Sequence, residues 1–253
     1  MASDIERMNK KLRRKRIRKI VGFVFGVIVA VPVVIILLRM FLKTNAILIE
    51  NGTRYSSASL LSSCSQYVGQ TMLDFETDSD KLFPPEEFSY IDSAEINILL
   101  PDKMVIRLKE STPVLSLQTV EGSFIYIDGN RKVLEITDSK CPGTVLITGM
   151  ELVNVKEGYI LDSTENYEIS LIDSIAASLK AHSLYDRLTF MDFTKKYDIY
   201  FVLDNMIEVR IGNSDDIDKK IDMLVNILAR NPSGERAIVN VKNYKEGRYK
   251  ALD

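Results

Sequence analysis

The hydrophobic pattern of the chain begins with one unbroken apolar stretch, Ile20 to Leu38, which has nineteen residues and no charge. At about 1.5 Å of rise per residue, a helix of this length covers roughly the 30 Å hydrocarbon core of a bilayer. A signal peptide has a shorter apolar part and ends at a small-residue cleavage site, and a buried core helix alternates with polar positions. The pattern therefore predicts a transmembrane helix at residues 20–38.

After this stretch the pattern changes between short strands and helical spacing. Ala46 to Glu50 is an apolar run that stops at the turn signal Asn51-Gly52. Helical spacing follows up to Gly69, and a short helical turn lies before Pro84-Pro85. Two runs of alternating polarity, joined at Leu100-Pro101-Asp102, cover Ser93 to Leu99 and Lys103 to Glu110. The order strand, helix, short helix, strand, strand predicts a compact α+β unit.

The second half is rich in predicted strands, with two amphipathic helices among them. The helices cover roughly Ser163 to Ser183 and a segment that begins near Asp215 and stops at Asn231-Pro232. Strands are predicted at Val114–Leu117, Ser123–Ile127, Val133–Ile136, Val145–Thr148, Leu188–Asp192, Asp198–Leu203, Met206–Ile211 and Arg236–Val241. This half is predicted to be a mixed sheet with both helices on one face, so the fold class of the whole chain is α+β.

Charge is divided unequally between the two sides of the predicted span. Residues 1–19 carry nine Lys/Arg and two acids, which leaves a net charge of −9 on the remaining chain. Basic residues stay cytoplasmic, so we expect the N-terminus inside and everything after Arg39 outside. An acidic outer part argues against nucleic-acid binding. Two cysteines, Cys64 and Cys141, are too few for a disulfide framework, and Cys64 is predicted to fill a core position.

Residues with catalytic or metal-binding chemistry are sparse. The single histidine, His182, ends an amphipathic helix, where it is expected to interact with the helix dipole rather than act as a base. The alternating acids that begin at Asp74 lack the calcium-loop pattern, because Ser79 and Pro85 occupy the positions of the required Gly and Glu. We therefore predict no enzyme activity, no catalytic residue, no metal or cofactor, and no small-molecule substrate.

The last predicted strand is the candidate for protein binding. A strand near the chain end can lie at a sheet edge, where unpaired backbone groups accept a strand from a partner. Lys242 and Lys245 follow it and could instead protect such an edge from pairing. The pattern alone leaves these two alternatives open.

Several fragments, in order behind a single N-terminal span, resemble the FtsQ/DivIB family of bacterial cell-division proteins. The similarity to the POTRA domain of that family covers Phe41 to Pro113. The similarity to its β domain rests on the hairpin Phe124 to Leu134 and on Ile211-Gly212-Asn213 before a helix. The fragments of the POTRA domain are Ile47-Leu48-Ile49-Glu50-Asn51-Gly52, Gly69-Gln70-Thr71-Met72-Leu73, Tyr90-Ile91-Asp92-Ser93-Ala94, Leu100-Pro101 and Val105-Ile106-Arg107-Leu108-Lys109-Glu110-Ser111-Thr112-Pro113.

The resemblance implies a domain plan with five parts. It comprises a basic cytoplasmic tail at 1–19, the transmembrane helix at 20–38, a βααββ POTRA domain at 39–112, a β domain at 113–242 and a C-terminal tail at 243–253.

The resemblance also implies a role as a bitopic scaffold at the division septum, binding FtsL-type and FtsB/DivIC-type partners and regulating septal peptidoglycan synthesis. The family binds the FtsB/DivIC subunit through the last strand of the β domain and adjacent residues. Carried over to this chain, those positions are Ile238, Asn240, Lys242 and Tyr244. Two alternatives remain at this point: a membrane-anchored cell-wall hydrolase and another kind of extracytoplasmic protein-binding module.

Overall fold

The computed structural model describes residues 2–71, 78–162, 167–231 and 234–252, and within these it describes side chains from residue 19 onward, apart from those of residues 20 and 167. The chain divides into two compact units. Unit 1 contains residues 1–82 and 94–108, and unit 2 contains residues 83–93 and 109–253. Each unit is described by itself below. Outside the described residues lie the acids Asp74 and Glu76, the motif residues Met72 and Leu73, and Ser163 and Pro232 at expected helix ends.

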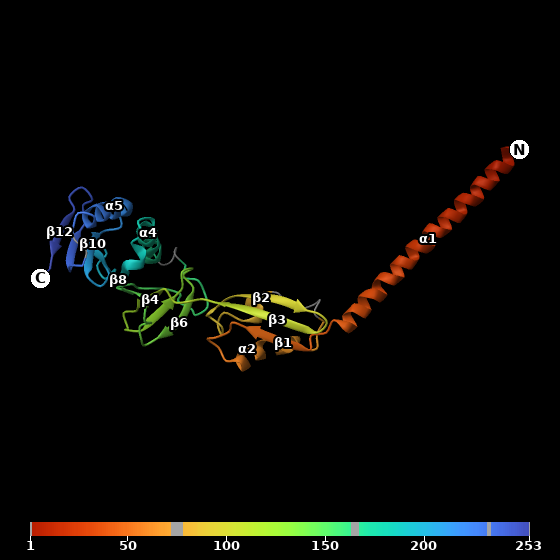
Figure 1. Cartoon of the computed structure of the whole chain (residues 1–253), viewed down its shortest axis with the longest axis horizontal. Coiled ribbons are helices and arrows are strands. Elements are labelled where there is room, and N and C mark those ends of the chain that lie inside the picture. Colours follow the sequence, from red (N-terminus) through yellow and green to blue (C-terminus); the bar gives the residue numbers. More distant parts are fainter. Residues whose placement is uncertain (1, 72–77, 163–166, 232–233, 253) are drawn as a thin grey trace. The chain divides into compact units, whose positions relative to one another are not determined.

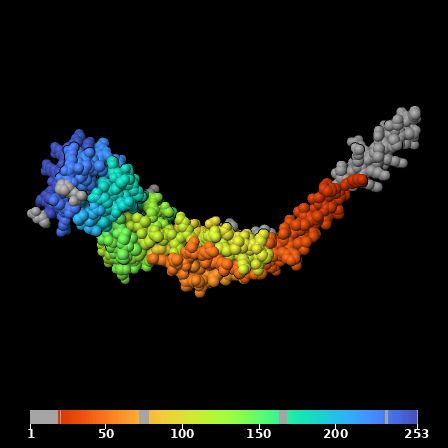
Figure 2. All heavy atoms as spheres, viewed as in Figure 1, coloured from red at the N-terminus to blue at the C-terminus, as the bar shows by residue number. Residues whose placement is uncertain are grey.

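Unit 1 begins with one long helix, α1 (Ala2–Phe41), which runs through both the basic segment and the apolar stretch (Figure 1). Its part Val21–Phe41 has the length and composition of a membrane-crossing helix, and none of its most apolar window is buried. In Figure 2 this part is coloured red, and the face turned to the viewer is exposed along most of its length. Side chains such as Phe23 and Phe25 would otherwise meet water, so this helix fits the predicted single transmembrane segment.

The rest of unit 1 is a three-stranded sheet with a helix on one face. The strands β1 (Ala46–Glu50), β3 (Lys103–Glu110) and β2 (Ile91–Leu99) lie in the order β1-β3-β2, with β1 parallel to β3. Helix α2 (Ser57–Cys64) starts where the hydroxyl of Ser56 accepts a hydrogen bond from the Ser59 amide at 3.1 Å. The turns η1 (Ser65–Tyr67) and α3 (Ser79–Leu82) complete the predicted strand and helix order.

The core of unit 1 lies between α2 and the sheet. Leu60 and Cys64 of α2 are buried, as are the alternating positions Met104, Ile106 and Leu108 of β3. The helical spacing of α2 follows from burial on one side, whereas Val105, on the other face of β3, is buried as well. The prediction that Cys64 fills a core position is confirmed.

Unit 2 is built on one nine-stranded mixed sheet, with the order β12-β11-β10-β9-β8-β7-β4-β5-β6. Helices α4 (Tyr167–Ala181) and α5 (Ile217–Leu228) contact each other and share a continuous core with the sheet (Figure 1). A short turn, η3 (Tyr185–Arg187), precedes β8. The strands are β4 (Leu115–Gln118), β5 (Phe124–Ile127), β6 (Val133–Thr137), β7 (Val145–Thr148), β8 (Leu188–Asp192), β9 (Ile199–Leu203), β10 (Ile207–Gly212), β11 (Ala237–Asn240) and β12 (Arg248–Ala251). The predicted α+β class is thus confirmed.

Burial along the strands of unit 2 explains why one face of the sheet is covered. Val209 and Ile211 of β10 and Val239 of β11 are fully buried together with Ile221 and Leu224 of α5. The alternate positions on the same strands are only partly buried. The helices therefore cover one face of this part of the sheet, as predicted from the alternation.

Residues 83–93 are part of unit 2, although they follow α3 of unit 1 and include the first three residues of β2. The hydroxyl of Ser89 donates to the carbonyl of Leu134 at 2.5 Å, and the hydroxyl of Tyr90 donates to a carboxylate oxygen of Glu135 at 2.6 Å. The ammonium of Lys132 donates to the carbonyl of Ile91 at 2.6 Å. These bonds attach the segment to β6.

A second group of contacts holds the start of the same segment. Tyr159 donates a hydrogen bond to the carboxylate of Glu86, and Lys156 lies 3.2 Å from that carboxylate. The hydrogen bond from Tyr159 is the main reason why the pKa of Glu86 is lowered to about 2. Gly158, with φ of +83°, packs directly on the carbonyl group of Pro85. Residues 83–93 thus belong structurally with the large sheet. The boundary between the POTRA domain (39–112) and the β domain (113–242), which the resemblance implies, stays a prediction.

The C-terminal end of the large sheet differs from the expected one. The predicted last strand, 236–241, corresponds to β11, which pairs with β10 on one side and with β12 on the other. It is therefore an internal strand, and the expectation that it lies at the edge is wrong. Residues 243–253, expected as a tail, contain β12, which is the outermost strand.

Candidate protein-binding edge of the large sheet

The edge strand β12 has one side of its backbone paired and the other side open. It runs antiparallel to β11, with Lys250 opposite Ile238 and Tyr249 opposite Val239. The amide of Leu252 donates to the carbonyl of Arg236 at 2.7 Å, so inward and outward backbone groups alternate from this point. The N–H and C=O groups of Tyr249 and Ala251 consequently point outward, and none of the described strands pairs with them.

The side chains of β12 alternate between the two faces of the sheet. Arg248 and Lys250 lie on the uncovered face, opposite Asn240 and Ile238 of β11. Tyr249 lies on the other face, partly buried against the hydrophobic core. The edge therefore has an aromatic residue toward the core and two cations on the uncovered face.

A glycine allows the chain to return along α5 into β12. A Cβ atom at Gly247 would lie 2.6 Å from the Cδ1 atom of Ile227 and 2.7 Å from the Cγ atom of Met223. Both distances are shorter than a normal contact, so a larger residue here would require the side chains of Ile227 and Met223 to shift. This approach positions the start of β12 against the helix.

Two of the four residues singled out from the sequence lie on the uncovered face beside the edge. Ile238 and Asn240 are partly buried and are aligned with Glu208 and Arg210 of β10. Glu208 and Arg210 form an ion pair at 2.6 Å, and its hydrogen bond raises the pKa of Arg210. A partner strand added to β12 would thus lie next to a surface with one apolar and several charged positions.

Lys242 is engaged within the sheet rather than at its edge. Its ammonium lies 2.6 Å from a carboxylate oxygen of Asp198, which precedes β9. Its amide donates to the side-chain oxygen of Asn240 at 3.1 Å. Lys242 therefore fixes the chain as it leaves β11.

From the ion pair between Lys242 and Asp198 we predict how the carboxyl group of Asp198 titrates with acid. The ammonium of Lys242, which lies 2.6 Å from the carboxylate, is the main cause that lowers the pKa of Asp198 below its ordinary value of 3.8. The contribution of the pair to stability is therefore complete above that ordinary value and is lost as the pH falls through the lowered pKa. In Lys242→Met we expect the pKa of Asp198 to rise, measured by NMR titration of its carboxyl carbon. An unchanged pKa would show that the pair does not form in solution, and Lys245→Met serves as the control.

Tyr244, the fourth of these residues, lies on the other side of the sheet. The ammonium of Lys219, in α5, is 4.9 Å from the centre of its ring, and that of Lys245 is 5.8 Å away. Tyr244 is therefore held near the first turn of α5 by cation–π contacts. The structure brings Ile238 and Asn240 together on one face, and it places Tyr244 apart from them.

The residues that the sequence did not reveal are Arg248, Tyr249, Lys250 and Ala251. Their alternation after Gly247 is a strand signal, but it is only four residues long and two of the residues are charged. Edge strands are short and charged because these features limit unwanted pairing. The same features weaken their signal in the sequence.

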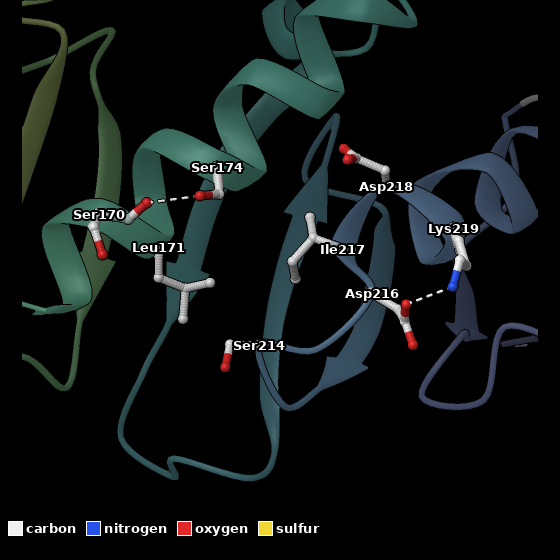
Figure 3. Close-up of a pocket in the computed structure, with 8 residues that line it drawn as sticks. All are labelled: Ser170, Leu171, Ser174, Ser214, Asp216, Ile217, Asp218 and Lys219. Atoms are coloured by element: carbon white, nitrogen blue, oxygen red, sulfur yellow. Dashed lines mark hydrogen bonds and ion pairs between the residues drawn. The ribbon is translucent and has the colours of Figure 1, made fainter.

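A hollow between α4 and α5 has a volume of about 480 Å³ (Figure 3). Ser174 donates to the carbonyl of Ser170 at 2.9 Å, and Asp216 forms an ion pair with Lys219 at 2.7 Å.

The single histidine, His182, does not line this hollow. Its Nε2 atom lies 3.0 Å from a carboxylate oxygen of Asp222. This pair joins the end of α4 to α5, where a dipole interaction was expected from the sequence.

The described residues include two cysteines but no cluster arranged for metal binding. Among them, no group of three or more His, Cys, Asp or Glu side chains is arranged to hold a metal ion. Cys64 and Cys141 are both free thiols. Burial raises the pKa of Cys64 to about 11, which keeps it as an unreactive thiol at neutral pH.

Comparison with known proteins connects this architecture to cell division. No family model matches the chain. The chain is 26% identical over 231 residues to the cell division protein DivIB of Clostridium botulinum strain Hall, a match that covers 91% of this chain and 89% of that protein. The DivIB protein of the strain Loch Maree matches with the same identity and coverage. With one helix of membrane-spanning length followed by two α+β units, the chain is similar to DivIB cell-division proteins over nine-tenths of its length.

Proposed function

We propose that this protein is a non-enzymatic scaffold of the bacterial divisome, anchored by one span with its N-terminus in the cytoplasm. Its outer part binds FtsL-type and FtsB/DivIC-type partners at the division septum, and in this way it stabilises the division complex and regulates septal peptidoglycan synthesis. The likeness to DivIB over nine-tenths of the chain supports a role in cell division. The basic residues before the apolar part of α1 support the orientation.

The open backbone edge of β12 is the observation that carries the binding site in this proposal. A strand from the partner adds to the sheet by hydrogen bonding to the outward groups of Tyr249 and Ala251. Ile238 and Asn240 lie one strand further in, where long side chains of the added strand reach them past Lys250 and Arg248. Lys242 and Tyr244 hold the loop from β11 to β12 through their contacts with Asp198 and Lys219, and this loop positions the edge.

A charge at Ile238 tests the contribution of the uncovered face. We expect Ile238→Asp to weaken binding of the outer segment of the DivIC-type partner by at least about tenfold, because an apolar contact is replaced by a charge that must be desolvated. Binding is measured by calorimetry with the purified outer part of both proteins, and circular dichroism verifies the fold. Val120→Asp, at a loop position that is 81% exposed, is the matched control. Equal affinities for both variants would contradict the site.

The cellular part of the proposal has its own experiment. A fluorescent fusion of the full chain should concentrate at midcell in dividing cells, and protease added to intact protoplasts should digest the C-terminal portion. A uniform distribution over the membrane would contradict the septal role, and a protected C-terminal portion would contradict the orientation.

A further inference from the structure

The strands of unit 1 place one end of its sheet next to the end of the membrane helix. The amides of Asn45 and Ala46 both donate to the carbonyl of Asp102, at 2.9 and 3.3 Å. The amide of Thr44 donates to the carbonyl of Gln70 at 2.9 Å, and the amide of Gly69 donates to the carbonyl of Thr44 at 2.7 Å. The turn between β2 and β3 and the loop around Gly69 therefore both adjoin the start of β1.

The chain between the helix and this end of the sheet is very short. The amide of Leu42 still donates to the carbonyl of Leu38 at 2.8 Å, so helical hydrogen bonding continues one residue past α1. Only residues 43–45 remain before β1, and three residues span at most about 11 Å. A bilayer adds about 5–8 Å of headgroup region on each side of its hydrocarbon core. This end of the sheet must consequently lie at or close to the headgroups.

The same end of unit 1 exposes apolar side chains. Leu99 is 51% exposed, Leu100 is 70% exposed and Val68 is 52% exposed. Leu99 ends β2, Leu100 belongs to the turn, and Val68 directly precedes Gly69. In water, exposed apolar residues at one end of a sheet are unfavourable, whereas at a bilayer surface their burial is favourable.

Basic residues accompany these apolar side chains. Lys43 lies in the short connection and forms a bridge with Thr71, and Lys103 is exposed at the start of β3. Arg39 is in the last turn of α1. The acid nearest in sequence, Asp102, accepts a hydrogen bond from the side chain of Asn45 at 3.2 Å. Cations beside exposed apolar residues suit a surface that contains anionic lipids.

We propose that Val68, Leu99 and Leu100 form a second membrane contact, which enters the interface of the bilayer beside the transmembrane helix and prefers anionic lipid. We call these three residues the membrane-proximal apex. The contact goes beyond the proposed scaffold role and does not depend on any division partner. It restricts the motion of unit 1 at the membrane surface, because it adds a second attachment to the covalent connection at 43–45.

Depth-dependent quenching in lipid nanodiscs tests this contact with the full chain. A fluorescent label is attached to Val68→Cys in a Cys141→Ser background, where the remaining Cys64 is fully buried. Ala58→Cys is the matched control, because Ala58 is exposed on α2, which follows the far end of β1. We expect brominated lipid to reduce the fluorescence at position 68 by at least about twofold and to leave position 58 nearly unchanged.

A second variant separates contact with lipid from contact with protein. In the label background at position 68, the double substitution Leu99→Ser and Leu100→Ser should reduce the quenching, and phosphatidylglycerol should support more quenching than phosphatidylcholine. Equal quenching at positions 68 and 58 would overturn the proposal. A label at position 68 that is shielded from water but not quenched by brominated lipid would also overturn it, since it would indicate a second copy of the chain.

Discussion

Ala251→Pro is expected to abolish most of the binding of the DivIC-type partner while leaving the sheet folded. The amide of Ala251 points away from β11, so proline removes only an outward donor and no hydrogen bond of the existing ladder. The proline ring also occupies the space that an added strand needs. One lost hydrogen bond and this steric conflict together should weaken binding by more than about tenfold.

The control for this prediction is Ala251→Val, which keeps the N–H group and suits a strand. Calorimetry with the outer segment of the partner should give this variant an affinity within about twofold of the original, since the substitution should change the free energy of binding by less than about 0.5 kcal/mol. Circular dichroism and the denaturation midpoint confirm that both variants are folded. If Ala251→Pro binds as well as Ala251→Val, then strand addition at β12 is not the mode of recognition.

Gly158→Ala is expected to have the largest effect on stability among the substitutions considered. Gly158 adopts φ of +83°, and an added Cβ atom would overlap the carbonyl group of Pro85. The left-handed backbone alone costs about 1–2 kcal/mol for alanine. The overlap requires residues 83–93 to move, so we expect a total loss of about 3–5 kcal/mol in the free energy of unfolding.

Gly143→Ala provides a matched control for this substitution. Gly143 has φ of +80° and no atom within 4 Å of an added Cβ, so only the backbone cost applies. The two free energies of unfolding are compared by urea denaturation of the outer part, followed by circular dichroism because the chain has no tryptophan. Faster amide hydrogen exchange in residues 83–93 should accompany Gly158→Ala alone. Equal losses in the two variants would mean that the attachment of this segment contributes little.

The hydrophobic pattern predicted well those elements whose conformation depends mainly on local interactions. Nineteen apolar residues form a membrane-length helix whatever follows them, since backbone groups in a bilayer must be satisfied within the helix. The alternation in 103–110 and the turn signal at 128–130 correspond to β3 and to the hairpin of β5 and β6. The resemblance to the FtsQ/DivIB family added the order of the domains.

The candidate site could be predicted only in part. Ile238 and Asn240 do lie beside the edge, because alternation in β11 places them opposite the buried Val239. Lys242 and Tyr244 were carried over from the family resemblance, and their partners Asp198 and Lys219 come from distant elements. Such pairings depend on the tertiary arrangement and leave no local pattern.

The sequence by itself determined the membrane helix, the α+β class and the faces of the strands, because these follow from local periodicity and from burial on one side of each element. Only the tertiary structure decided which strand is outermost and which unit holds residues 83–93. Both depend on backbone hydrogen bonds and close contacts between distant segments, such as those of β12 with β11 and of Gly158 with Pro85. A four-residue charged strand and a loop between a helix and a strand have too little hydrophobic pattern to reveal where they pair.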